Sequence, residues 1–148
     1  MLESSGPQPP DTTVTFRAGE PRVIVLRHGP PEQIVFAELT FPRAAFAQHG
    51  SEVRVDVRPR PGVYGLDLVT TLPIRDSATI AFKYPRYFAG SARARAVYGS
   101  DIAYERALGI GRVMPGSMLA FLTSARPHSD MLLAPLPAAG TYLVAAPQ

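Results

Sequence analysis

The chain has 148 residues, of which 46% are hydrophobic and 18% charged, proportions that fit a globular domain and exclude a disordered chain. The absence of cysteine excludes disulfide scaffolds, thiolate zinc sites and iron–sulfur clusters. The net charge of +3 comes from arginines spread along the chain and does not indicate a clustered nucleic-acid surface. No run of about eighteen apolar residues occurs, so the sequence predicts no membrane-spanning helix.

Residues 1–12 are polar and rich in proline, and we interpret them as a flexible tail that buries nothing. Residues 1–10 lack the basic start and apolar core of a signal peptide. We expect one folded domain over residues 13–148, because no repeat or change in composition marks a second.

The first half of this domain consists of short apolar segments separated by proline and glycine. Residues 22–27 predict a buried strand, and residues 33–41 predict a second strand that ends at Pro42. Alternating valines over residues 52–58 predict a strand with one buried face, which we expect to form a hairpin with residues 63–70.

The strand pattern breaks after residues 78–84, where Pro85 ends the strand. Ser100 or Asp101 then predicts the N-cap of a short helix ending at Leu108, with Gly109 as its C′ glycine. After the helix, residues 117–124 and 131–134 predict strands on either side of a loop. Residues 141–145 predict the closing strand.

These elements predict an all-β fold, a sandwich of about seven to nine strands that is immunoglobulin-like in the broad sense, with one short helix over residues 101–108. The closing segment LPAAGTYLV, residues 136–144, resembles the last turn and strand of bacterial immunoglobulin-like and prealbumin-like sandwiches. Gly62, Val63 and Tyr64 repeat its Gly-x-Tyr pattern. We expect each tyrosine to pack its ring at the core edge and to bond a backbone group through its hydroxyl.

A second resemblance concerns residues 124–131, SARPHSDM, which are similar to the ligand loop of blue-copper proteins. His128 and Met131 match the later two ligands of that loop. The cysteine is missing, since Ser124 or Ala125 stands in its place, and this excludes a blue-copper centre. A cysteine-free copper site built from His128, Met131, Met118 and Met114 stays as an alternative, because thioethers and imidazole suit Cu(I).

No catalytic motif is evident in the sequence, so we expect no enzyme activity. The segment PGSML lacks the second glycine of a nucleophile elbow, and GIGRV lacks the rest of a phosphate-binding loop. Asp101 and Glu105 are explained as a helix cap and a surface charge.

The segment KYPRYFAGSARAR, residues 83–95, carries arginines and tyrosines on an irregular excursion from the sandwich. Because these residue types are enriched at interface hot spots, we predict a partner-binding surface made of Arg86, Tyr87, Arg93, Arg95 and Tyr98. Weak binding of single-stranded nucleic acid through Arg93 and Arg95 is an alternative.

Taken together, these features predict a non-catalytic β-sandwich that mediates a protein–protein interaction or serves as an accessory subunit of a larger assembly, at a bacterial cell envelope. We expect no cofactor if the chain is such an interaction module, and copper if it carries the cysteine-free copper site.

Overall fold

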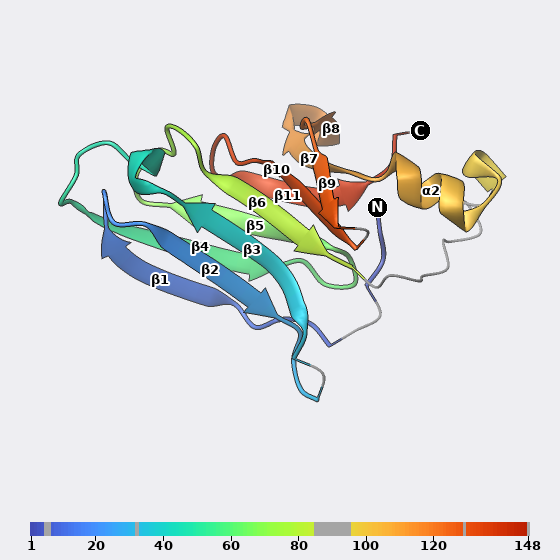
Figure 1. Ribbon diagram of the computed structural model, residues 1–148, viewed down its shortest axis with the longest axis horizontal. Coiled ribbons are helices and arrows are strands. Elements are labelled where there is room, and N and C mark those ends of the chain that lie inside the picture. The colour runs from blue at the N-terminus through green and yellow to red at the C-terminus, as the bar shows by residue number, and fades with distance from the viewer. Residues whose placement is uncertain (5–6, 32, 85–95, 129, 148) are drawn as a thin grey trace.

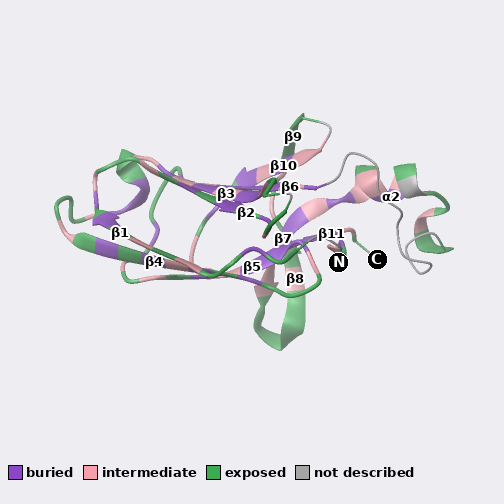
Figure 2. Ribbon diagram, turned by 90° about the horizontal axis from the view of Figure 1, so that it is seen from below, coloured by how far each residue is buried: buried purple, intermediate pink, exposed green. Residues whose placement is uncertain are grey.

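The structure, a computed structural model, describes residues 1–4, 7–31, 33–84, 96–128 and 130–147. Within these ranges the chain forms two antiparallel sheets that pack face to face, as Figures 1 and 2 show. One sheet has the order β1, β4, β5, β11, β7, β8, and the other has the order β2, β3, β6, β10, β9. The predicted all-β sandwich is therefore confirmed.

The strands are short, as the spacing of proline and glycine predicts. Their bounds are β1 Thr12–Arg17, β2 Arg22–Arg27, β3 Val35–Phe41, β4 Glu52–Pro59, β5 Gly65–Thr70, β6 Thr79–Lys83, β7 Gly109–Met114, β8 Met118–Phe121, β9 Ala125–His128, β10 Met131–Pro135 and β11 Gly140–Ala145. The described strands exceed the predicted seven to nine, because β7 was not expected as a strand and β9 was expected as a loop.

Within the described residues, helical structure is limited to short pieces. The helix α2 spans Asp101–Ala107, and the 3₁₀ turns η1 and η2 span Arg43–Ala45 and Pro115–Ser117. Ser100 is the N-cap of α2, since its Oγ accepts a hydrogen bond from the Ala103 N–H at 3.1 Å. The helix ends without the expected glycine cap, because Leu108 turns into extended backbone and Gly109 already begins β7.

The core lies between the two sheets and is built from inward-facing residues at alternate positions along the strands. Val53, Val55 and Val57 of β4 are fully buried, as their alternation with charged residues predicts. The predicted hairpin is confirmed, because β4 pairs antiparallel with β5 with Val57 opposite Leu68. Burial of each such aliphatic side chain stabilises the fold by about 1.5 to 3 kcal/mol.

Tyr142 anchors the closing strand in the manner expected from its Gly-x-Tyr sequence. Its side chain is fully buried, and its hydroxyl donates a 2.5 Å hydrogen bond to the Ala138 carbonyl. The hydroxyl is thus satisfied while the ring fills the core, which is how a buried tyrosine avoids the cost of an unpaired polar group.

The N-terminal segment differs from the expected tail that buries nothing. Leu2 is only 4% exposed and belongs to the core. Its N–H donates to the Val144 carbonyl at 2.8 Å, and its carbonyl accepts from the Tyr64 N–H at 3.0 Å, so it lies between the ends of β5 and β11. Pro9 is buried as well. One leucine placed where β5 and β11 leave backbone groups unpaired is enough for this docking. The polar, proline-rich composition of residues 1–12 does not indicate it.

Two further expectations are corrected. The strand β2 is an edge strand with an exposed face and is not buried throughout, since Val23 is 54% exposed. The predicted loop over residues 125–130 contains β9, which pairs with β10. Pro127 is tolerated there because β9 is an edge strand, where an N–H facing solvent is dispensable.

Candidate protein-interaction surface

The predicted contact surface falls mostly on residues 85–95, which lie outside the described residues. Arg86, Tyr87, Arg93 and Arg95 belong to that segment, and so they stay a prediction. Tyr98 is described: it is partly buried, and its ring centroid lies 5.7 Å from that of Tyr104 in α2. Part of the Tyr98 side chain is therefore packed against the core.

The end of the sandwich that carries α2 is tied together by polar contacts. In Figure 1 both termini lie at this end. The Tyr104 hydroxyl donates to the Met1 carbonyl at 3.2 Å. Arg126 of β9 donates to the Tyr84 hydroxyl and, at 2.8 Å, to the Glu105 carbonyl of α2. Burial raises the pKa of Tyr84, and the adjacent Arg126 opposes that rise.

The four predicted copper ligands form two separate pairs. His128 lies opposite Met131 in the pairing of β9 with β10, and Met114 lies opposite Met118 in the pairing of β7 with β8. These strand pairs belong to different sheets, and Figure 2 shows β8 and β9 directed to opposite sides of the sandwich. The described structure therefore does not bring the four side chains into one ligand set.

The other histidines lie apart from these pairs. His28 is buried, its Nδ1 lies 2.9 Å from the Pro7 carbonyl, and its ring meets Phe36 edge-on. His49 lies against Gly19, where an added Cβ would come within 3.0 Å of the imidazole Cγ. Within the described residues no three His, Cys, Asp or Glu side chains gather as a metal ligand group. Nor is any described helix long and apolar enough to cross a membrane.

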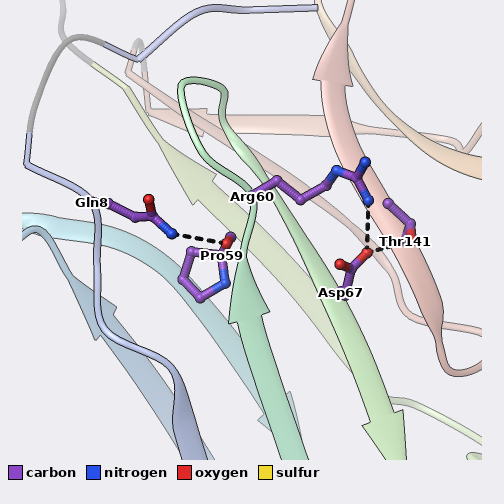
Figure 3. Close-up of polar contacts among 5 residues, drawn as sticks. All are labelled: Gln8, Pro59, Arg60, Asp67 and Thr141. Carbon is purple, nitrogen blue, oxygen red and sulfur yellow. Dashed lines mark hydrogen bonds and ion pairs between the residues drawn. The ribbon is translucent and has the colours of Figure 1, made fainter.

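The outer face of the six-stranded sheet divides into two halves of different chemistry. We call the outer face of β1, β4 and β5 the charged half; it carries Arg54, Asp56, Arg58 and Asp67. Asp56 accepts a 2.6 Å hydrogen bond from Thr13 and lies 3.5 Å from Arg54. Figure 3 shows Asp67 accepting from Arg60 at 3.1 Å and from Thr141 at 2.5 Å. Nearby, Gln8 donates to the Pro59 carbonyl at 3.2 Å.

The other part of this face, which we call the apolar half, is formed by Leu143 of β11, Gly111 and Val113 of β7, and Leu119 and Phe121 of β8. The pairing places all five on one side of the sheet, with Leu143 opposite Gly111, Gly111 opposite Phe121, and Val113 opposite Leu119. No charged side chain lies among them. The sheet surface is thus uncharged from β11 to its edge at β8.

Strand glycines allow large side chains to lie flat on the apolar half. A Cβ on Gly65 would lie 2.3 Å from the Leu143 side chain, and one on Gly111 would lie 2.5 Å from Leu119. The Phe121 ring leans over Gly109, at 3.4 Å from the same kind of added Cβ. Each glycine therefore leaves a depression that a neighbouring side chain fills, and the resulting surface is flat and apolar.

The apolar half continues into an exposed hairpin tip. Figure 2 shows the turn between β7 and β8 standing out from the sandwich and exposed. Met118 is 71% exposed and Phe121 is 41% exposed, and residues 113–125 contain no charged residue. This uncharged run is a sequence signal for the surface, although its pattern predicts only a strand over residues 117–124.

A cleft of about 550 Å³ lies at one end of the other sheet. It is lined by segments before β6, before β9 and after β10, including Thr79, Ala125, Leu133 and Pro135. Its lining is predominantly apolar by area and includes the polar residues Arg75, Asp76, Ser77, Thr79, Thr123 and Ser124.

The apolar half therefore differs in chemistry from a solvated sheet face. Comparison of the chain with protein-family models, with curated proteins and with solved structures finds no match.

Proposed function

We propose that this β-sandwich is a non-catalytic module that docks onto a larger protein assembly through its apolar half. The observation that carries the proposal is the exposed, uncharged face of β7 and β8, where Phe121 and the hairpin tip meet solvent. Contiguous apolar surface on a folded domain is typical of protein-interaction sites, because exposing it to water costs free energy that a partner recovers.

The shape of this surface supports the same role. Phe121 and Leu119, which lie flat over Gly109 and Gly111, give a level contact area on a rigid sheet. A rigid, preorganised surface loses little conformational entropy on binding. Aromatic side chains, here that of Phe121, are among the types enriched in interfaces.

The arginines and tyrosines of residues 85–95, with Tyr98, remain a second predicted contact region of the same module. Their residue types are those of interface hot spots. The location of the assembly at a cell envelope likewise remains part of the proposal.

The test compares a charge placed on each half of the same sheet face. Phe121→Lys places a cation in the apolar half, and Val69→Lys places one in the charged half, at a residue that is 59% exposed. Native mass spectrometry of the protein isolated gently from its source is expected to show a complex with another polypeptide. We expect Phe121→Lys to lose this complex and Val69→Lys to keep it. Retention by both variants would refute the role of the apolar half.

A second candidate function, Cu(I) binding, is favoured by one observation: His128 and Met131 lie directly opposite each other on adjacent strands. Imidazole and thioether are suitable ligands for Cu(I). In a Cu(I) titration of the purified chain, the His128→Ala variant should bind more weakly than the original. Equal affinity of the two proteins would exclude this site.

A further inference from the structure

The strand β8 is an unprotected edge of the described six-stranded sheet. Each of the other three edge strands carries arginine: β1 has Arg17, β2 has Arg22 and Arg27, and β9 has Arg126 next to Pro127. The sequence of β8, MLAF, has neither a charge nor a proline. Charged residues and proline are the usual means by which edge strands avoid pairing with another chain. The absence of both at β8 singles it out among the four edges.

The hydrogen-bond alternation shows which backbone groups face this edge. The Leu122 N–H donates to the Ile110 carbonyl at 2.9 Å, and Ala120 is paired with Arg112. In an antiparallel ladder such hydrogen-bonded pairs alternate with residues whose N–H and C=O point the other way. The N–H and C=O groups of Leu119 and Phe121 therefore point away from β7, toward the open edge.

A second copy of the same strand fits this edge in one register. Opposite residues of an antiparallel pair lie on the same face, so a side chain of the apolar half must meet one from the apolar half of the other chain. Pairing Leu119 with Phe121 of the second chain satisfies this condition and also joins the outward backbone groups. Ala120 then lies opposite its own copy on the twofold axis.

The two neighbouring registers are less favourable. If Phe121 lay opposite its own copy, Leu119 would face Thr123, which is polar and lies beyond the end of β8. If Leu119 lay opposite its own copy, Phe121 would face Ser117, which has a φ of 59° and belongs to the turn η2. That backbone is not extended and cannot continue a ladder. The register with Ala120 on the axis keeps every paired residue, from Met118 to Leu122, apolar.

From these observations we infer that the chain forms a homodimer in which β8 pairs antiparallel with β8 of a second copy, joining the two six-stranded sheets into one. The contact is isologous, so it closes as a dimer and does not propagate. The inference deepens the proposed function and rests on it: the dimer makes the two apolar halves continuous, with Phe121 of one chain beside Leu119 of the other, and thereby doubles the docking surface.

Single cysteines test both the dimer and its register, because the chain has no cysteine of its own. Ala120 and Leu119 lie next to each other on β8, and each is replaced in turn in the full chain. Across a non-hydrogen-bonded antiparallel pair the two Cα atoms are about 4.5 Å apart, within the range of a disulfide. With oxidised glutathione as oxidant, Ala120→Cys should give a covalent dimer at least about ten times faster than Leu119→Cys, because only the residue on the axis meets its own copy.

Sedimentation equilibrium of the unmodified chain is the second measurement, and it should show a monomer–dimer equilibrium. A monomer at all concentrations, or faster cross-linking of Leu119→Cys, would overturn the inferred dimer or its register. The result is independent of the docking test. A monomeric chain whose complex with another polypeptide is lost in Phe121→Lys would refute the dimer and leave the proposed function standing. A dimeric chain that forms no complex with another polypeptide would support the inferred dimer and refute the proposed function.

Discussion

The two halves of the six-stranded sheet share one backbone architecture but have opposite outer surfaces. In the charged half, Asp56 and Asp67 accept hydrogen bonds from threonines and lie beside arginines, so each polar group is paired or solvated. In the apolar half, Leu119, Phe121 and Leu143 lie over strand glycines. The inner faces of both halves contribute to one core. The difference therefore concerns what each outer face meets, water on one side and, as we propose, protein on the other.

This comparison shows how a sandwich can carry a docking surface without a pocket or an added domain. Sheet pairing fixes the backbone, and the residue types at alternate positions decide whether a face is solvated or can bind another protein. The strand β11 lies between the halves, since it pairs with β5 on one side and β7 on the other. Substitutions at and beside β11 should therefore test the comparison most directly.

The largest expected effect is that of filling a strand glycine at the boundary of the halves. Gly65→Ala forces its Cβ against the buried Leu143, and we expect a loss of about 1 to 3 kcal/mol in the free energy of unfolding. Gly111→Ala is the matched control: it displaces Leu119 at an exposed edge, where the side chain can turn outward, so the loss should stay below about 1 kcal/mol. Urea unfolding measures both. Equal losses would show that the two positions are packed alike.

An intermediate effect is expected at Tyr142 on β11. Tyr142→Phe removes the hydrogen bond to Ala138 and should cost about 1 kcal/mol near neutral pH. Burial raises the pKa of Tyr142 from 10.0, and the nearby Arg112 opposes the rise.

The folded state thus keeps the phenol protonated where the unfolded state ionises. This contribution is fully present below pH 10, the ordinary tyrosine pKa, and is lost as the pH rises through the raised value. We expect the stability of the original chain to fall more steeply above pH 10 than that of Tyr142→Phe. Parallel curves from unfolding experiments at increasing pH would contradict the assignment.

The smallest effect is expected in the charged half, where the groups are solvated. Asp67→Ala removes contacts with Arg60 and Thr141, yet the Asp67 side chain is 43% exposed, so the loss should be at most about 1 kcal/mol. Asp67→Asn keeps an oxygen for Thr141 and loses only the charge. We expect this variant to differ from the original chain at low salt and to match it at high salt, because salt screens exposed ion pairs. A difference that persists at high salt would show that the charge is not solvated.

The sequence alone determined the all-β class, the hairpin of β4 and β5, the short helix after Ser100 and the packing of Tyr142. Each of these depends on local patterns: alternation of Val53, Val55 and Val57, a capping serine, or a turn glycine before tyrosine. Such patterns act through neighbours within a few residues, so they can be recognised without knowing the fold.

Only the tertiary structure decided which strands lie at the sheet edges and which residues from distant segments come together. Leu2 reaches the core through β5 and β11, strands far from it in sequence, and β8 is an edge because no described strand follows it in the sheet order. The separation of His128 and Met131 from Met114 and Met118 likewise follows from the assignment of their strands to different sheets. These outcomes depend on pairings between distant segments, which the period of hydrophobic residues within one segment does not encode.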